Sequence, residues 1–232
     1  MKVLEAHDLA KSYRGGDGGL IHVLSGVNLT VSRGEMVAVV GASGAGKSTL
    51  LHLLGALDRP TRGYVVLMGE PIHEKRDEEL AEIRNRKVGF VFQFHHLLRE
   101  FSALENVMMP LRIGGRGLRD ARSRAEELLA RVGLTGRMHH RPSELSGGEQ
   151  QRTAVARALA ADPAILLADE PSGNLDHANA EMLHRLFAEL ARDLELGMVV
   201  VTHNRSLASR ADRVLLLDDG RLIETDMREA VT

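Results

Sequence analysis

Residues 41–48 of the 232-residue chain read Gly41-Ala42-Ser43-Gly44-Ala45-Gly46-Lys47-Ser48. The apolar run at 37–40 just before them predicts a buried strand, and the pattern over 49–54 predicts a helix. A glycine-rich turn that ends in Lys-Ser between a strand and a helix is the context of a phosphate-binding loop. The sequence therefore predicts an α/β fold that holds a nucleotide at this turn.

The residue types of this loop suit the binding of phosphate groups. Glycines allow successive backbone N–H groups to point at one anion, and the following helix adds the positive end of its dipole. We expect Lys47 to neutralise the outer phosphates and the Ser48 hydroxyl to ligate Mg²⁺. A nucleoside triphosphate with Mg²⁺ fits this set of groups.

Two adjacent carboxylates, Asp169 and Glu170, follow a second apolar run at 165–168. Acidic residues after a strand are common at turns and helix caps, so this pair alone is a weak signal. Together with the phosphate loop, it predicts the other half of a nucleotide site. We expect Asp169 to hold the magnesium shell, and Glu170 to accept a proton from the attacking water or to orient it.

A second glycine-containing turn, Ser146-Gly147-Gly148-Glu149, precedes a helical pattern that runs to about residue 160. One interpretation makes it a capped turn, with Ser146 as the helix cap. The other makes it a second anion site, because a hydroxyl, glycine amides and a helix dipole converge there. One chain with two phosphate-reading loops indicates that they are used across a dimer interface.

Elsewhere in the chain, strand-like runs alternate with amphipathic helices, a pattern typical of a largely parallel sheet. One helix is expected between Asp120, as its N-cap, and Gly133. A second is expected to begin after Asp176 and to place Leu194 on its apolar stripe. The segment at about 94–160 lacks strand signals and predicts a helical lobe within a single domain spanning 1–232.

Composition excludes several classes of function. Thirty Lys and Arg balance 32 Asp and Glu, giving a net charge of −2 and disfavouring a nucleic-acid partner. With no cysteine, the chain has no thiol nucleophile, no disulfide and no cysteine-based metal site, which suits a cytoplasmic location. No run approaches the roughly 18 apolar residues of a membrane span. We therefore expect membrane contact only through partners.

The run Leu145-Ser146-Gly147-Gly148-Glu149 resembles the signature of the ATP-binding subunits of ABC transporters, and the resemblance extends over residues 4–223. It implies a P-loop NTPase of the ABC ATPase type, with a RecA-like core, an antiparallel β lobe and an inserted helical lobe. It also implies that two copies close head to tail around two MgATP. Each site would then combine the phosphate loop of one chain with the signature of the other.

The resemblance assigns roles to further residues. It implies that Tyr13 stacks on adenine, that Gln93 reaches the metal and the water, and that His203 contacts the γ-phosphate. Catalysis is then expected of Glu170, His203, Gln93 and Lys47, and metal ligation of Ser48, Gln93 and Asp169. The expected ATP-binding residues are Tyr13, Gly41, Ala42, Ser43, Gly44, Ala45, Gly46, Lys47, Ser48, Thr49, Ser146, Gly147, Gly148, Glu149 and Asp176.

Residues 93–98 (QFHHLL), 101–110 (FSALENVMMP) and 141–144 (RPSE) are most similar to the lipoprotein-releasing subfamily, LolD. The resemblance implies a homodimer with two LolC/LolE-like permeases, peripheral on the cytoplasmic face of the inner membrane. There it would power the release of outer-membrane lipoproteins. The Met-rich stretch at 94–110 is consistent with an adaptable docking groove for the permease, or with the core of the helical lobe.

Other assignments share much of this chemistry. Macrolide-export and cell-division ATPases of the same family have nearly the same site residues and stay open as alternatives. A chromosome-maintenance ATPase is disfavoured, because only 97 residues separate Lys47 from Leu145 and no heptads appear. A catalytically inactive regulator is disfavoured because Glu170 and His203 are both present.

Overall fold

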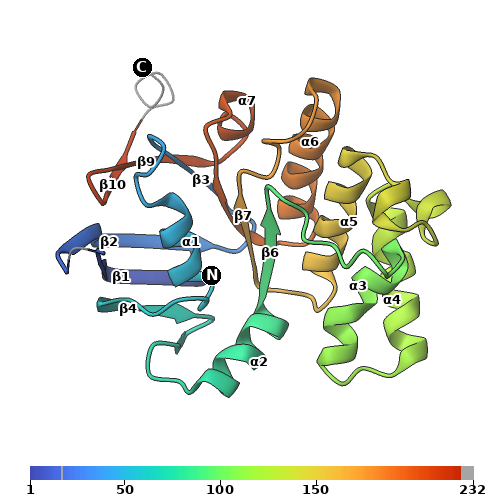
Figure 1. Ribbon diagram of the computed structural model, residues 1–232, viewed down its shortest axis with the longest axis horizontal. Helices are drawn as coiled ribbons and strands as arrows, with labels where there is room; N and C mark the ends of the chain where they lie inside the picture. Colours follow the sequence, from blue (N-terminus) through green and yellow to red (C-terminus); the bar gives the residue numbers. More distant parts are fainter. Residues whose placement is uncertain (17, 226–232) are drawn as a thin grey trace.

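The computed structural model describes residues 1–16 and 18–225 (Figure 1). A six-stranded sheet of order β10-β9-β3-β8-β7-β6 forms its centre, and all neighbouring strands are parallel except β9 and β10. Its strands are β3 (Met36–Val40), β6 (Val88–Phe92), β7 (Ile165–Asp169), β8 (Gly197–Val201), β9 (Arg213–Asp218) and β10 (Arg221–Glu224). Continuous apolar runs build the middle strands because both faces of the sheet are covered. The largely parallel sheet predicted from these runs is confirmed.

A second, antiparallel sheet of order β2-β1-β4-β5 covers one side of the molecule. It comprises β1 (Lys2–Arg14), β2 (Leu20–Ser32), β4 (Arg62–Leu67) and β5 (Glu70–Pro71). Helix α1 (Lys47–Leu54) lies between the two sheets, because Leu50 and Leu53 share one buried cluster with Leu4 of β1 and Val39 of β3. This packing fixes the helix that follows the phosphate loop.

Helices fill the opposite side (Figure 1). They are α3 (Ala103–Ile113), α4 (Leu118–Arg131), α5 (Gly147–Leu159) and α6 (His177–Asp193), with short turns at Thr135–Arg137 and Pro142–Glu144. Two further helices, α2 (Asp77–Lys87) and α7 (Arg205–Ala208), flank the central sheet. A second buried cluster joins Val155 of α5 and Phe187 of α6 to Leu166 and Met198 of the sheet. The helical lobe is thus continuous with the core that carries the site.

Two details of the predicted helices are wrong. Helix α4 begins at Leu118 with Gly117 as its cap, so Asp120 lies in its first turn instead of capping it. Both positions favour an acidic residue, since each is close to the positive end of the helix dipole. Leu194 follows the end of α6 and is 37% exposed, so it does not continue the apolar stripe.

Candidate active site

The phosphate loop has the backbone conformation that its glycines permit. Gly41, Gly44 and Gly46 have φ values of +154°, +81° and +97°, in the region that favours glycine. A Cβ at Gly46 would lie 2.8 Å from Val23 Cγ1, so the loop also needs glycine for space. The Lys47 ammonium donates to the carbonyl oxygens of Gly41 (2.8 Å) and Ala42 (2.9 Å). The loop therefore curls around the lysine, with the N-terminus of α1 behind it.

A cavity of about 410 Å³ opens between this loop and the end of β7. Five loop residues, Thr49, both predicted carboxylates and one residue of β2 line it: Ser43, Gly44, Gly46, Lys47, Ser48, Thr49, Asp169, Glu170 and Val23. The cavity lies at the carboxyl ends of β3 and β7, which flank β8 in the sheet, and this is the edge where α/β sheets bind ligands. Val23 was not foreseen, because an apolar residue in a strand gives no signal of a site.

Glu170 is held at the edge of this cavity by residues that follow β8. Its backbone N–H donates to the Val201 carbonyl (2.9 Å), and its φ is +44°. Its carboxylate accepts from the Thr202 hydroxyl (3.2 Å) and from the backbone N–H of His203 (3.1 Å). The ring Nδ1 of His203 lies 2.8 Å from the same carboxylate. The structure thus brings together Glu170 and His203, which are far apart in the sequence.

Gln93 follows β6 and is held by the segment 172–176. Its amide donates to Asn174 Oδ1 (3.1 Å), and the Asn174 amide donates back to the Gln93 carbonyl (3.2 Å). A Cβ at Gly173 would lie 2.9 Å from Gln93 Nε2, so this packing is close. Asp176 caps α6 by accepting from Asn179 N (2.9 Å). Neither Gln93 nor Asp176 is among the residues that line the 410 Å³ cavity.

The Ser146–Glu149 turn caps α5. The Ser146 hydroxyl accepts from Glu149 N (3.3 Å), and the Glu149 carboxylate accepts from Ser146 N (2.8 Å). This second bond, helped by the Ser146 hydroxyl and the Arg137 ion pair (3.0 Å), lowers the pKa of Glu149, although burial acts in the opposite direction. The capped-turn interpretation is confirmed. None of these four residues lines the cavity described above, so this chain's own signature does not complete its own site.

Tyr13, in β1, is 39% exposed. Its hydroxyl donates to Asp58 (2.8 Å), and the Lys11 ammonium, itself bound to Asp58 (2.7 Å), lies 4.8 Å from the ring centre. Burial, then the Asp58 carboxylate, raises the pKa of Tyr13. Asp58 was not foreseen as its partner, because only the folded chain brings the segment between α1 and β4 to β1; Lys11 lies two residues before Tyr13 on the same face of β1. The stacking of Tyr13 on adenine stays a prediction.

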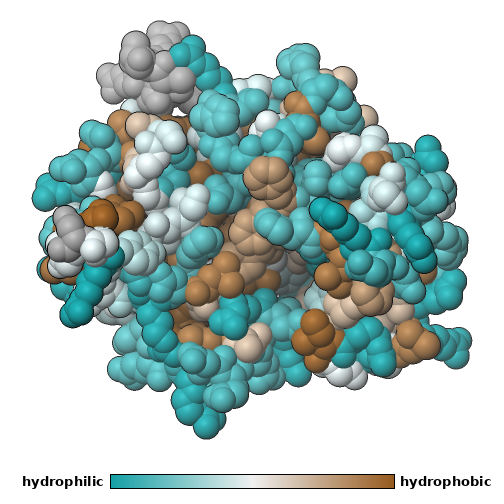
Figure 2. Space-filling view, viewed as in Figure 1, coloured by the Kyte–Doolittle hydropathy of each residue, from teal (hydrophilic) through white to brown (hydrophobic). Residues whose placement is uncertain are grey.

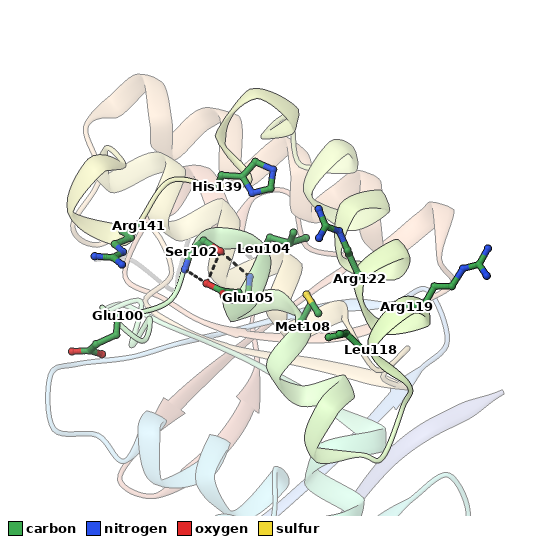
Figure 3. Close-up of a pocket in the computed structure, with 10 residues that line it drawn as sticks. All are labelled: Glu100, Ser102, Leu104, Glu105, Met108, Leu118, Arg119, Arg122, His139 and Arg141. Atoms are coloured by element: carbon green, nitrogen blue, oxygen red, sulfur yellow. Dashed lines mark hydrogen bonds between the residues drawn. The ribbon is translucent and has the colours of Figure 1, made fainter.

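A larger cavity, of about 830 Å³, lies in the helical lobe (Figure 3). Its lining includes Met108 and Leu118 among arginines and glutamates, and has no glycine or lysine. Its positive charge comes from arginines, not from the lysine and glycine amides of the predicted phosphate loop. None of the predicted site residues lies in it.

An apolar groove of about 490 Å³ lies on the surface between β6 and α3, where the sheet joins the helical lobe. Phe90, Phe92, Leu98, Pro110 and Ile113 are among its lining residues. Figure 2 shows hydrophobic residues gathered around a hollow on this face, in the area between α2 and α3 of Figure 1. Part of the stretch at 94–110 lines this groove, and its other side chains, such as those of residues 103, 104 and 107, are buried in the core of the lobe. Its role as a docking groove stays a prediction.

Across residues 1–16 and 18–225, no helix combines the length and the hydropathy needed to cross a bilayer.

Comparison with known proteins gives one family. The family model described as ABC transporter matches residues 24–173. The lipoprotein-releasing system ATP-binding protein LolD of Geobacter metallireducens is 54% identical over 221 residues, which cover 95% of this chain and 98% of that protein. LolD of Cytophaga hutchinsonii is 51% identical over 222 residues, 96% of this chain and 99% of that protein.

The solved structures give the same fold. The dimeric post-hydrolysis structure of the ATP-binding cassette MJ0796, bound to ADP and Pi, has a TM-score of 0.88 and 40% identity, and covers 97% of this chain and 99% of that one. The expected ABC ATPase fold is therefore confirmed. Since the family model covers more than half of the chain and these relatives match nearly all of it, the chain belongs to the ABC transporter family, as an ATP-binding subunit that hydrolyses ATP.

Proposed function

We propose that this chain is the ATP-hydrolysing subunit of a complex that releases lipoproteins from the bacterial inner membrane. The observation that carries the proposal is its identity of 51–54% to LolD proteins over nearly the full length of both chains. The site chemistry alone would fit any active member of the family, since the same groups serve every ABC ATPase. The groove beside Gln93 is where the subfamilies are expected to differ.

Hydrolysis is proposed to occur by in-line attack of water on the γ-phosphate of ATP. Lys47 and the loop amides bind the phosphates and stabilise the charge that develops on them. Glu170 accepts a proton from the water, while His203, which bonds to Glu170 through Nδ1, keeps its exposed ring edge free for the γ-phosphate. Tyr13 is proposed to stack on the adenine.

Mg²⁺ fits the same cavity. The Ser48 hydroxyl and the Asp169 carboxylate line it and are the hard oxygen donors that this ion prefers. When bound, Mg²⁺ would neutralise part of the negative charge of the phosphates. Gln93 is the third proposed ligand, and its bond to Asn174 uses the Nε2 atom, not the Oε1 oxygen that would bind the ion.

The complete site is proposed to need two copies of the chain. Ser146–Glu149 lies outside the cavity of its own chain, yet presents a helix N-terminus with an exposed Gly147. Facing the phosphate loop of a second copy, this turn would supply amides and a hydroxyl to the γ-phosphate, and Asp176 would lie at the same interface. The cassette MJ0796 forms a dimer.

The apolar groove is proposed to receive a LolC/LolE-like permease, which places the chain on the cytoplasmic face of the inner membrane. Leu98 and Pro110 line it, and the segment that follows Gln93 forms part of one wall. Arg157 of α5 donates to the carbonyls of His95 (2.8 Å) and His96 (2.7 Å) in this segment. A movement in the groove can therefore reach both Gln93 and the signature helix.

Expression of a tagged Glu170→Gln chain in its source cell, followed by detergent extraction with ATP and mass spectrometry, tests the assignment. Two permease subunits together with lipoproteins are expected to copurify, because the variant holds ATP and keeps the complex closed. Copurification of an efflux pump with its outer-membrane channel, or of cell-division proteins, would overturn the lipoprotein assignment and leave the ATPase mechanism intact.

A further inference from the structure

A buried histidine on α6, His184, has no part in the chemistry described above. It is 1% exposed, and its Nε2 lies 3.0 Å from the hydroxyl of Ser172, which is 6% exposed. Its Nδ1 faces Glu181 Oε1 at 3.5 Å and has no hydrogen-bond partner of its own. Burying an imidazole destabilises the folded state unless other interactions compensate, because its nitrogen atoms lose their hydrogen bonds to water.

Glu181 extends the contacts of His184 to the loop after β8. Its carboxylate accepts from the Ser206 hydroxyl and from Arg210 (2.7 Å). These bonds, that of Ser206 first, hold the pKa of Glu181 at about 2, so the carboxylate is ionised and acts only as an acceptor. The proton of the neutral imidazole therefore belongs on Nδ1, and Nε2 accepts the Ser172 hydroxyl.

The contacts form a closed ring around the catalytic pair. Ser172 lies two residues after Glu170, and Ser206 lies three residues after His203. Glu170 and His203 bond to each other on one side of the ring, and His184 with Glu181 connects the two loops on the other. All of these groups lie at the carboxyl ends of β7 and β8 or on the helices after them.

We propose that His184 is a positioning residue for ATP hydrolysis: through Ser172 and Glu181 it fixes the loops that carry Glu170 and His203 relative to each other. The inference rests on the proposed role of this pair. It implies an effect on turnover without one on nucleotide binding, because the phosphate loop is outside the ring. Small displacements of a reacting group cost up to about 100-fold in rate.

His184→Phe, which keeps a planar ring and removes both nitrogens, is the main test on the full-length chain. We expect a kcat about tenfold lower, an ATP Kd within about twofold of wild type, and a recovery of most of the turnover in His184→Gln, whose amide restores a partner for Ser172. Glu189→Gln, on the exposed face of the same helix, is the matched control and should behave as wild type.

Ser172→Ala removes the same hydrogen bond by deleting one oxygen, and serves if His184→Phe does not fold. Its effect on kcat should not add to that of His184→Phe, because both break one contact. Unchanged turnover in both variants, or losses that add, would overturn the inference. If Glu170→Gln keeps normal turnover, the proposed function fails together with the inference. If Glu170→Gln loses turnover and His184→Phe does not, only the inference fails.

Discussion

Two helices of the lobe begin with the same capping box, and only one of them is assigned to the active site. Ser146 caps α5 and Ser102 caps α3 (Figure 3), and in each the hydroxyl accepts at 3.3 Å and the backbone N–H donates to a glutamate at 2.8 Å. Replacing either serine by alanine should cost about 1 kcal/mol of folding free energy. For a chain of this length, Tm should fall by about 2–4 °C in each case.

The two variants should differ in ATP turnover. On the proposed cross-dimer assignment, Ser146→Ala also removes a hydrogen bond to the γ-phosphate, and a bond to a charged group contributes about 1.5–3 kcal/mol. Turnover by the dimer should therefore fall by about 10- to 150-fold, whereas Ser102→Ala should keep it. The ATP affinity of the isolated monomer should stay unchanged in both.

Phosphate release by the assembled complex and calorimetric titration of the monomer measure these effects, with Tm as the check on folding. Equal loss of turnover in both variants would show that the signature serine acts only as a cap. Weaker ATP binding by the Ser146→Ala monomer would show that the turn acts within its own chain. Either result would refute the cross-dimer assignment.

Three other changes test separate parts of the site and the fold. Glu170→Gln should bind ATP normally and lose at least about 100-fold in kcat, since an amide cannot act as a base; a variant with half the turnover would remove Glu170 from that role. Lys47→Ala should lose ATP binding in a calorimetric titration, and an unchanged affinity would contradict the assignment of the loop. Lys75 and Lys87 lower the pKa of Glu70 from 4.5 to about 2, so the stability that Glu70 adds is present above pH 4.5 and is lost as the pH falls toward 2. The difference in urea stability between wild type and Glu70→Gln should vanish over that range, and a constant difference would exclude the ion pairs as its cause.

Local sequence predicted the glycine-rich turn between β3 and α1, because its geometry depends on neighbours in the chain. Gly41, Gly44 and Gly46 shape a turn whose strand and helix are adjacent in sequence. The environment of Glu170 could not be predicted in this way, since the Glu170 carboxylate meets His203 only after β7 and β8 pair. The contact of His184 could not be predicted either. A histidine on an amphipathic helix is not distinctive in the sequence, and only the fold places Ser172 against it.

The fold shows the same division. The middle strands of the parallel sheet were predicted because short, continuous apolar runs bounded by turn residues are typical of buried strands. The long strands β1 and β2 alternate buried with exposed residues and include polar ones, so their patterns are weaker and only pairing defines them. The end of helix α4 was predicted correctly from Gly133, whose left-handed conformation (φ +74°) stops the helix. Its start was predicted wrongly at Asp120.

ATP-driven release of a membrane-anchored lipoprotein tests the central claim most directly. The complex of this chain with its permeases would be reconstituted in vesicles that carry an acylated lipoprotein, and the lipoprotein transferred to a water-soluble acceptor would be measured. We predict transfer that requires ATP and is lost with Glu170→Gln chains. ATP hydrolysis without any transfer of lipoprotein, in a complex whose turnover depends on Glu170, would contradict the account.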